Sequence, residues 1–272
     1  MTLPLISSIH NPKAQAWKAL SGPARARREQ GLFLAEGEHM AGEALKASAC
    51  RVLLVREDDQ ERYSALIGQA ERREIPVQPL SDRVMAAVCD VRAPQGVAAV
   101  CPLPALTKTL ETPTVAALED VQDPGNVGTV LRTLDALGGG GLLITPGCAD
   151  PFSPKALRAS MGAVFRVPVC MTEDLPAALR DYHQRGYRSL AGALDGTPFY
   201  DRPPDPEKVL VLIGNEGAGL SGPVKALACE RIRLPMRGEA ESLNAAVASI
   251  SARRSRSSIS QIAASIRLKK TN

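Results

Sequence analysis

The sequence has few aromatic residues and no long apolar run, and both deficits narrow what the chain can be. Aromatic residues make up 3% of its 272 positions and hydrophobic residues 44%, so aliphatic and alanine side chains must form most of the core. A membrane-spanning helix needs about 20 consecutive apolar residues, and no run approaches that length. The N-terminus also lacks the basic and apolar segments of a secretory signal. We therefore expect a cytoplasmic protein without a membrane partner.

The cysteines lack the pattern of a metal site or of a disulfide framework. There are six, at positions 50, 89, 101, 148, 170 and 229, and no two form a C-x-x-C motif. This scatter suits a reducing compartment and small, buried or half-buried side chains. No cluster of His, Cys and Asp ligands is visible either, so we expect no metal cofactor.

Positive charge is concentrated at one end of the chain. The net charge is +4, yet residues 252–272 contain six Arg and Lys residues and no acid. The remainder is slightly acidic, so any nucleic-acid surface in the body of the protein must be local.

Residues 1–105 predict a small α/β domain. Apolar runs at 51–55, 75–80 and 96–100 are typical of buried strands, and residues 38–48 and 61–74 have helical apolar spacing. Residues 106–113 follow as a predicted linker, since the surrounding segment is rich in proline and has no clean period.

A larger α/β domain is predicted for residues 114–252, followed by a basic Ser/Arg-rich tail at 253–272. Its strands are expected at 115–119, 142–145, 165–169, 189–193, 209–213 and 232–234. Helices fit between them, and such alternation implies a mostly parallel sheet covered on both faces.

The stretch "QDPGNVGTVLRTLDALGGGG" (122–141) joins a predicted strand to a helix through glycines. Asn126 is expected to cap the helix, leaving free amides that favour an anion. Arg132 lies one turn after Gly128 and can reach over it toward the loop. A dinucleotide loop would need G-x-G-x-x-G, whereas this stretch contains only G-x-x-G. Taken alone, the stretch also fits a capped helix with a solvated arginine.

Two further turns follow predicted strands. "VLVLIGNEGAGL" (209–220) opens into glycines around Glu216, and "IRLPMRGEAESLNAAVAS" (232–249) leads through a polar loop into a helix that starts near Ser242. All three turns open on the carboxyl edge of the sheet, where ligands of open α/β sheets bind. Three polar turns at one edge favour a functional site.

Together these stretches resemble the SpoU/TrmH family of S-adenosylmethionine-dependent RNA ribose 2′-O-methyltransferases. The family's three motifs match "NVGTVLRT" (126–133), "GNEGAGL" (214–220) and "LPMRGEAESLN" (234–244), and "SPKALRASMGAVFRVPV" (153–169) resembles its connecting segment. Residues 11–45 more weakly resemble the RNA-binding domain that precedes the catalytic domain in many rRNA-modifying members.

The resemblance implies a trefoil knot, a homodimer and S-adenosylmethionine held by the loops of the second and third motifs. The implied cofactor-binding residues are Ile213, Gly214, Asn215, Gly219, Leu234, Met236, Ser242 and Leu243. The implied catalytic residues are Arg132, Asn126, Glu216, Ser242 and Asn244.

Particular roles follow for these catalytic residues. The family is often assigned its arginine as general base, but a guanidinium has a pKa of about 12 or higher. A charged Arg132 could instead hold a phosphate beside the target ribose. Asn126 would orient RNA or Arg132, and Glu216 would anchor the second-motif loop or Arg132. Ser242 and Asn244 would shape the ribose pocket.

Cations near the N-terminus predict an RNA-binding surface, and they are Lys13, Lys18, Arg25, Arg27 and Arg28. The scarcity of aromatics favours structured RNA over an unpaired strand, and the resemblance implies that this RNA is rRNA. The alternatives are a tRNA ribose 2′-O-methyltransferase and a non-catalytic RNA-binding protein with this fold. A nucleotide-dependent oxidoreductase would instead require NAD(P)H binding.

The tail departs from the family, whose members usually continue through a long apolar-faced helix at the dimer interface. Residues 251–272 contain few large apolar side chains. We expect the helix to end near residues 251–258 and the rest to be mobile or weakly docked.

Overall fold

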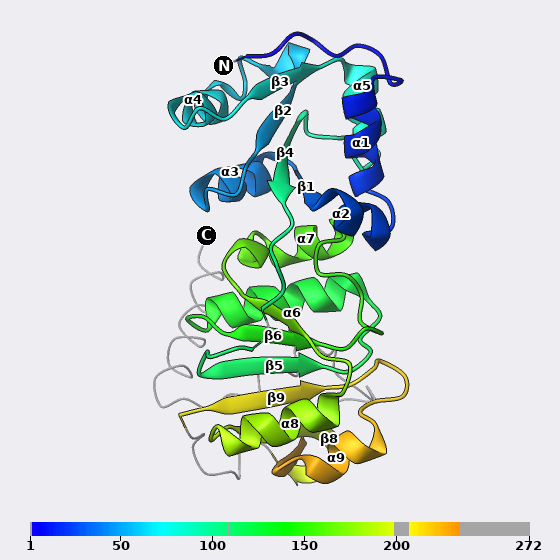
Figure 1. Cartoon of the computed structure of the whole chain (residues 1–272), viewed down its shortest axis with the longest axis vertical. Coiled ribbons are helices and arrows are strands. Elements are labelled where there is room, and N and C mark those ends of the chain that lie inside the picture. Colours follow the sequence, from blue (N-terminus) through cyan, green and yellow to red (C-terminus); the bar gives the residue numbers. More distant parts are fainter. Residues whose placement is uncertain (1, 108, 199–206, 234–272) are drawn as a thin grey trace, which may run out of the picture. The chain divides into compact units, whose positions relative to one another are not determined.

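The computed structural model describes residues 2–107, 109–198 and 207–233, and these form two compact units (Figure 1). Among the described residues, the first unit spans residues up to Ala105 and Asp150–Arg166, and the second spans Leu106–Ala149 and the residues from Val167 to Arg233. Among the described residues, no helix is long and apolar enough to cross a bilayer.

The strands of the first unit form a mixed sheet. Its order is β1–β4–β2–β3, in which β1 and β2 run antiparallel to β4 and β3 runs parallel to β2. The strands are β1 (Leu32–Glu36), β2 (Val52–Arg56), β3 (Val77–Leu80) and β4 (Val97–Pro102). Three of them confirm the strands expected from apolar runs, whereas β1 was not expected.

Helices cover both faces of this sheet (Figure 1). One face packs on α1 and α5 through a core that includes Trp17, Leu54 and Met85. The other face packs on α3, which confirms the helix expected over 38–48, and α4 occupies part of 61–74. The helical elements are α1 (Pro12–Leu20), α2 (Ala24–Gln30), α3 (Glu38–Lys46), η1 (Glu57–Asp59), α4 (Ser64–Arg72) and α5 (Asp82–Val88).

The strands of the second unit form a parallel sheet, which confirms the expected architecture. The order among the described residues is β10–β8–β9–β5–β6–β7, and every neighbouring pair is parallel. The strands are β5 (Thr114–Leu118), β6 (Gly141–Ile144), β7 (Val169–Met171), β8 (Arg188–Pro198), β9 (Val209–Ile213) and β10 (Glu230–Arg233).

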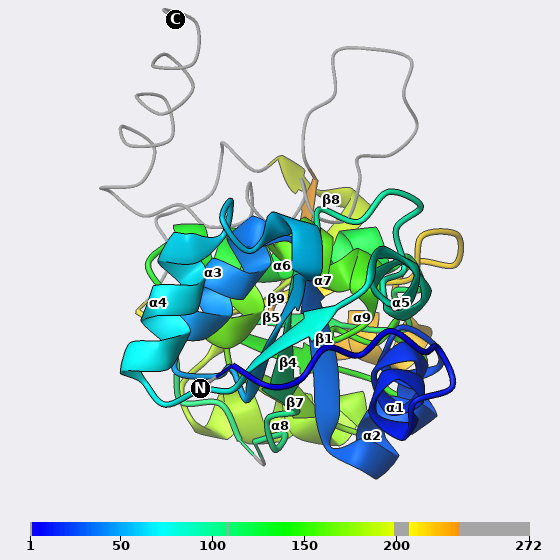
Figure 2. The same ribbon diagram turned by 90° about the horizontal axis from the view of Figure 1, so that it is seen from above.

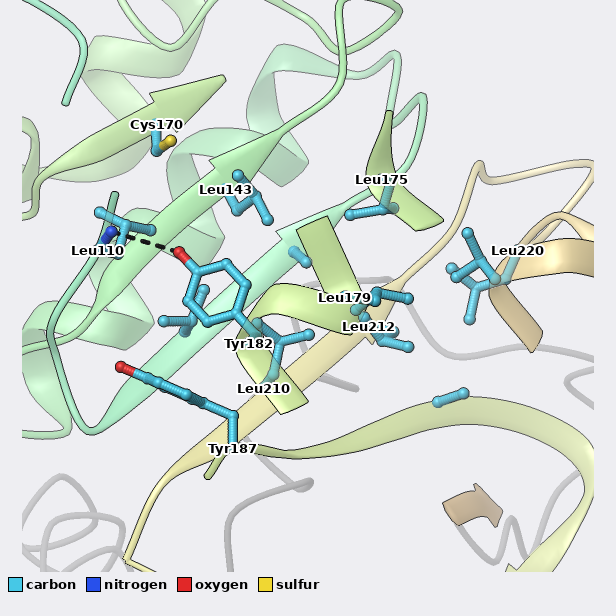
Figure 3. Packing of buried hydrophobic residues seen from close by; sticks show 14 residues of the cluster. Leu110, Leu143, Cys170, Leu175, Leu179, Tyr182, Tyr187, Leu210, Leu212 and Leu220 are labelled. Carbon is cyan, nitrogen blue, oxygen red and sulfur yellow. Dashed lines mark hydrogen bonds between the residues drawn. The ribbon is translucent and has the colours of Figure 1, made fainter. Parts of the chain in front are cut away.

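Helices lie on both sides of the parallel sheet, with α6 on one side and α8 on the other (Figure 2). The helices are α6 (Pro124–Ala136), α8 (Leu175–Gln184) and α9 (Gly222–Leu227). On the α8 side, Leu179 and Val224 pack with Leu143, Leu210 and other strand residues in one buried cluster (Figure 3). On the other side, α6 buries an apolar stripe formed by Val127, Val130, Leu131 and Leu134.

The strand expected over 165–169 is wrong in position. Residues Ala163–Phe165 form a short 3₁₀ helix (η2), and β7 begins only at Val169. Gly162 is left-handed, and Phe165 lies against Phe33 with ring centroids 5.8 Å apart. This packing belongs to the first unit, which also contains α7 (Pro154–Ser160).

The segment predicted to be a linker packs into the core of the second unit. Leu110 is 1% exposed. Its N–H donates to the Tyr182 hydroxyl (3.3 Å; Figure 3). Its carbonyl accepts from Arg185 (2.6 Å). The Tyr187 hydroxyl donates to the Thr112 carbonyl (2.7 Å). These bonds fix the start of β5, so residues 109–113 are part of this unit.

The cysteines are free thiols, and five of the six are buried or half-buried as expected. Burial raises the pKa of Cys50 and of Cys89 to about 12. Cys229 is exposed, contrary to expectation. The third motif and the basic tail at 253–272 lie outside the described residues.

Candidate functional site

The carboxyl ends of three adjacent strands build the candidate site. Strands β5, β6 and β9 are neighbours in the parallel sheet, so the loops that follow them open on one edge. These loops comprise residues 119–123, 145–149 and 214–221. Hydrogen bonds join the first loop to each of the other two.

The Glu216 carboxylate holds the start of α6. One carboxylate oxygen, Oε2, accepts from the Gln122 backbone N–H (3.1 Å). The other, Oε1, accepts from the Asp123 N–H (3.2 Å) and from the Asn126 side-chain amide (2.9 Å). The second motif therefore locks the first motif in place across the sheet edge, and Glu216 anchors this turn.

The expected N-cap of this helix is wrong. Helix α6 begins at Pro124, and Asp123 is its N-cap, accepting from the Gly125 N–H at 2.7 Å. Asn126 lies inside the first turn and is 7% exposed, and its side-chain amide donates a hydrogen bond to Glu216. Proline fits the first helical position because its missing N–H would have no partner there.

The same geometry corrects the expectation of free amides for an external anion. The N–H groups of Gln122 and Asp123 bond to Glu216, and that of Gly125 bonds to Asp123. A helix N-terminus favours negative charge, and here carboxylates of the chain itself supply it. A phosphate of RNA would have to bind elsewhere, with Arg132 as the candidate.

The pKa of Glu216 is lowered by this network. Partial burial alone would raise the pKa of Glu216, but hydrogen bonds from the Asn126 side chain and from the backbone of Gln122, Glu216 and Asp123 outweigh it. The carboxyl group is therefore ionised at neutral pH and acts as an acceptor for these donors.

The turn after β9 is closed by its own backbone. Asn215 and Gly219 exchange backbone hydrogen bonds of 3.1 and 2.9 Å, and the Asn215 side chain accepts from Gly217 and Ala218. A Cβ built on Gly214 would lie 2.2 Å from Gly219 C and from Leu220 N. Peptide groups therefore meet directly at this position, and only glycine fits there.

The loop after β6 is tied to the end of β5. Thr145 Oγ1 accepts from the Asp120 N–H (2.9 Å) and donates to its carboxylate (2.7 Å). Asp120 has a left-handed backbone (φ +54°), and its carbonyl accepts from the Asn215 side chain (2.8 Å). Aspartate tolerates this conformation better than most residues, so Asp120 joins the three loops.

Arg132 lies on α6 beyond this network and is exposed. Within the described part of the chain its guanidinium has no hydrogen bond or ion pair. Gly128, one turn earlier, is buried. Arg132 is thus a charged donor without an assigned structural role among these residues, which suits contact with a ligand.

The expected cofactor residues of the second motif lie together at the end of β9. Ile213 is buried, Gly214 and Asn215 are half-buried, and Gly219 is exposed. The residues expected from the third motif lie outside the described residues, and they are Leu234, Met236, Ser242, Leu243 and Asn244. Within the described residues, no group of three or more His, Cys, Asp or Glu side chains could hold a metal ion.

Arg27 must be removed from the expected RNA surface. It is 2% exposed, and its guanidinium donates to Asp150 Oδ2 (2.9 and 2.7 Å) and to the carbonyls of Leu20 and Gly22 (2.7 Å each). Its donors face the interior, so it cannot grip a phosphate.

The other four expected RNA-binding cations are exposed. Lys13 and Lys18 lie on α1, and Arg25 and Arg28 lie on α2. Arg25 pairs with Glu29 at 2.6 Å, but both side chains are largely in solvent. Exposed ion pairs of this kind contribute little to folding stability, so Arg25 can exchange Glu29 for a phosphate. All four cations are therefore accessible to RNA.

Sequence reasoning missed several residues of this edge. Glu119 accepts from the Ser221 N–H (2.7 Å), and Asp120, Asp123 and Thr145 form the bonds described above. Each follows an apolar run that ends a strand, so their position was a usable signal. A Cβ on Gly147 would lie 2.2 Å from Asp120 Oδ1, which explains the glycine.

Replacement of Glu216 by glutamine is expected to weaken folding and slow turnover. Glutamine offers one acceptor oxygen for three donors, and its amide would face that of Asn126. An unmade bond costs about 1 kcal/mol. Because the Glu216 pKa is lowered, its stabilisation is present above the unfolded pKa and is lost as pH falls through the folded pKa.

Urea unfolding at several pH values tests this expectation. The wild type should exceed Glu216→Gln in unfolding free energy at pH 7, and the difference should shrink toward pH 3. A difference that grows on acidification would contradict the lowered pKa.

The chain matches two protein families, one in each part. Residues 113–251 match the SpoU rRNA methylase family, and residues 11–99 match the MRM3-like substrate binding domain. The first match covers the strands and loops of the candidate site.

Full-length relatives support the same assignment. The chain is 34% identical to the 23S rRNA (guanosine(2553)-2′-O)-methyltransferase RlmP of Bacillus subtilis, over 89% of this chain and 95% of the relative. It is similar to the AdoMet-bound rRNA methyltransferase of Sinorhizobium meliloti, with 28% identity, TM-score 0.77 and coverage of 90% and 94%. It is equally similar in fold to the SpoU methyltransferase AviRb of Streptomyces viridochromogenes in complex with AdoMet, with 27% identity, TM-score 0.77 and coverage of 89% and 96%.

Proposed function

Because this chain belongs to the SpoU rRNA methylase family, it is an S-adenosylmethionine-dependent RNA ribose 2′-O-methyltransferase, and we propose that its substrate is ribosomal RNA. The observation that carries the proposal is the pair of matches: a methylase domain at 113–251 and an MRM3-like substrate binding domain at 11–99. The rRNA substrates in the names of the relatives support it over tRNA.

The β9 turn fits a cofactor held by backbone groups. The turn has glycine at positions 214, 217 and 219, and Gly217 and Gly219 are exposed. Its amides at 217 and 218 are held by Asn215, so the loop has one defined shape. Ile213, Gly214, Asn215 and Gly219 would hold S-adenosylmethionine here together with residues of the third motif. The cofactor supplies a methyl group already activated on a sulfonium.

The protein's own contribution is then to position the ribose hydroxyl and to manage its proton. We assign Arg132 to the RNA side, where a charged guanidinium holds a phosphate and lowers the pKa of the neighbouring hydroxyl. Asn126 and Glu216 fix the start of the helix that carries Arg132. Ser242 and Asn244 are proposed to shape the ribose pocket.

Ribose-methylation mapping of total RNA tests the substrate. A deletion strain should lack one or more 2′-O-methyl marks on rRNA that the wild type carries. Complementation with the wild-type gene should restore the marks, whereas the Arg132→Ala gene should not. A mark lost from tRNA instead would overturn the rRNA proposal.

The exposed cations of α1 and α2 are expected to carry RNA affinity. Replacing Lys13, Lys18, Arg25 and Arg28 by alanine should weaken binding to deproteinised rRNA about tenfold or more. Each phosphate interaction that the substitutions abolish should also reduce the slope of log affinity against log salt by about 1. Filter binding across a salt series measures both quantities.

A matched control removes four exposed arginines elsewhere in the same unit, namely Arg51, Arg72, Arg83 and Arg92. It should change affinity far less, because net charge alone acts non-specifically. An equal fall in affinity for the two quadruple variants would show that α1 and α2 do not form the RNA surface.

We further propose a homodimer, a trefoil knot in the catalytic domain and cytoplasmic residence, all on the basis of family membership. Sedimentation equilibrium tests the first of these: a monomer at micromolar concentration would contradict it.

A further inference from the structure

The chain enters the first unit twice, although the methylase family match runs without a break through the second entry. Residues Asp150–Arg166 lie within the matched region 113–251 but group with the substrate-binding unit. We call residues 150–166 the returning segment. It is buried in that unit by Phe152, Ala156, Leu157 and Val164, each 5% exposed or less.

Asp150, the first residue of the returning segment, is held by a buried cation. Arg27 grips Oδ2 of Asp150 with two nitrogens, Nε and Nη2, at 2.9 and 2.7 Å. Oδ1 of Asp150 accepts from the Phe152 N–H (2.9 Å). A charge-assisted bond to a planar guanidinium fixes both distance and orientation.

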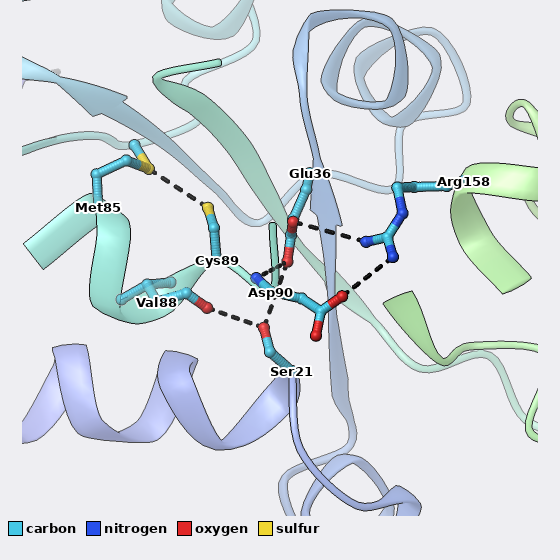
Figure 4. Close-up of polar contacts among 7 residues, drawn as sticks. All are labelled: Ser21, Glu36, Met85, Val88, Cys89, Asp90 and Arg158. Atoms are coloured by element: carbon cyan, nitrogen blue, oxygen red, sulfur yellow. Dashed lines mark hydrogen bonds and ion pairs between the residues drawn. The ribbon is translucent and has the colours of Figure 1, made fainter. Parts of the chain in front are cut away.

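Two arginines of the returning segment, Arg158 and Arg166, pair with acids of the unit. Arg158 donates to Asp90 (3.0 Å) and lies 4.0 Å from Glu36 Oε2 (Figure 4). The other oxygen of Glu36 accepts from the Asp90 N–H (2.7 Å), so the two acids are tied together.

The far end of the returning segment is fixed by Glu43 of α3. Arg166 pairs with its Oε2, and Lys46 donates to its Oε1 at 2.8 Å. A Cβ on Gly162 would lie 2.6 Å from Glu43 Cγ, so the backbone passes directly over this side chain. Phe152 and Phe165 both lie against Phe33.

The residues just before Asp150 belong to the candidate site. The Ala149 N–H donates to the Val121 carbonyl (2.9 Å), and Thr145 bonds to Asp120. Val121 and Asp120 directly precede the turn that Glu216 holds. One continuous stretch, 145–150, thus runs from the catalytic edge to the buried Arg27 pair.

We propose that Arg27 and Asp150 are positioning residues for methyl transfer, which hold the end of the loop 145–149 and, through its bonds to Val121 and Asp120, the catalytic turn of residues 119–123. This inference rests on the proposed function. The returning segment is the part of the substrate-binding unit to which the loop 145–149 is covalently joined. Misplacement of a catalytic group by about 1 Å can lower the rate about 100-fold. Loosening the Arg27–Asp150 pair should therefore slow methyl transfer without removing the contacts that bind RNA or S-adenosylmethionine.

The variant Asp150→Asn tests the inference, because it keeps the acceptor for Phe152 and removes the charge opposite Arg27. The substrate is deproteinised rRNA from the deletion strain, with saturating S-adenosylmethionine. We expect kcat to fall at least tenfold, KM for RNA to change less than twofold, and cofactor affinity by calorimetry to be unchanged.

The matched control is Glu29→Gln, which breaks the exposed Arg25–Glu29 pair on the same helix as Arg27. It should leave kcat unchanged. Unchanged kcat in Asp150→Asn overturns the proposal, and so does a joint fall of kcat, RNA affinity and melting temperature, which would indicate a purely structural role.

Arg158→Ala provides a second variant that should fold, because its pair with Asp90 is about 40% exposed on each side and such pairs add little stability. Like Asp150→Asn, it should lower kcat, here several-fold, while KM for RNA stays constant. Hydrogen exchange gives a readout independent of activity: adding rRNA should protect residues 145–150 in the wild type but not in Asp150→Asn. Equal protection in both proteins refutes the coupling, whereas an inactive wild type that still shows this difference refutes only the methylation of rRNA.

Discussion

Replacing Arg132 by alanine should lower kcat for methyl transfer by about 100- to 1000-fold or more, the range for removal of one preorganised electrostatic interaction. Affinity for S-adenosylmethionine should stay within about twofold of the wild type, because the expected cofactor residues lie on β9 and beyond. Arg132 is exposed on α6, whereas the Asn126 side chain in the first turn of that helix is bonded to Glu216. Calorimetry of cofactor binding and a single-turnover methylation assay measure the two quantities.

Arg132→Lys should lower kcat for methyl transfer nearly as much as Arg132→Ala. Lysine keeps the charge but not the planar fork that binds a phosphate through two nitrogens.

The control for Arg132 is Arg180→Ala, since Arg180 is an exposed arginine on α8 of the same unit. Its removal should leave the rate unchanged. If Arg132→Ala instead lost cofactor affinity and retained turnover, the assignment of Arg132 to RNA would be wrong.

The elements that could be predicted from the sequence are those fixed by local pattern. Strands β5, β6 and β9 are continuous apolar runs, because a parallel sheet covered on both faces buries every side chain. The stripe of α6 follows the helical period. Strand β1 was missed because its apolar run, Leu32–Ala35, is only four residues long and adjoins charged helices.

The features that could not be predicted depend on partners distant in the chain. The Gln122 amide bonds to a carboxylate 94 positions away, and Arg27 to one 123 positions away. Nothing in the local sequence distinguishes buried Arg27 from exposed Arg28. The same non-local contacts explain why residues 150–166 pack with the first unit rather than with the sheet that precedes them in sequence.

Gly214→Ala should raise the dissociation constant for S-adenosylmethionine by at least 100-fold. The added methyl group would lie 2.2 Å from Gly219 C and Leu220 N and 2.4 Å from the Gly219 carbonyl oxygen. These are backbone atoms that cannot rotate away, so the arms of the turn must separate and the bonds between Asn215 and Gly219 must break. Overpacking costs typically about 1–3 kcal/mol, which is small enough for the domain to stay folded.

Gly217→Ala is the matched control within the same turn. Its Cβ would meet only Asn215 Oδ1, at an ordinary 3.6 Å, and its backbone needs no left-handed angle. It should fold and bind the cofactor almost as the wild type does, so a difference between the two variants reports backbone closure of the turn rather than loss of a glycine. Circular dichroism confirms that both variants are folded before calorimetry compares their affinities. If Gly214→Ala bound S-adenosylmethionine as tightly as Gly217→Ala, the closed turn after β9 would not be what holds the cofactor.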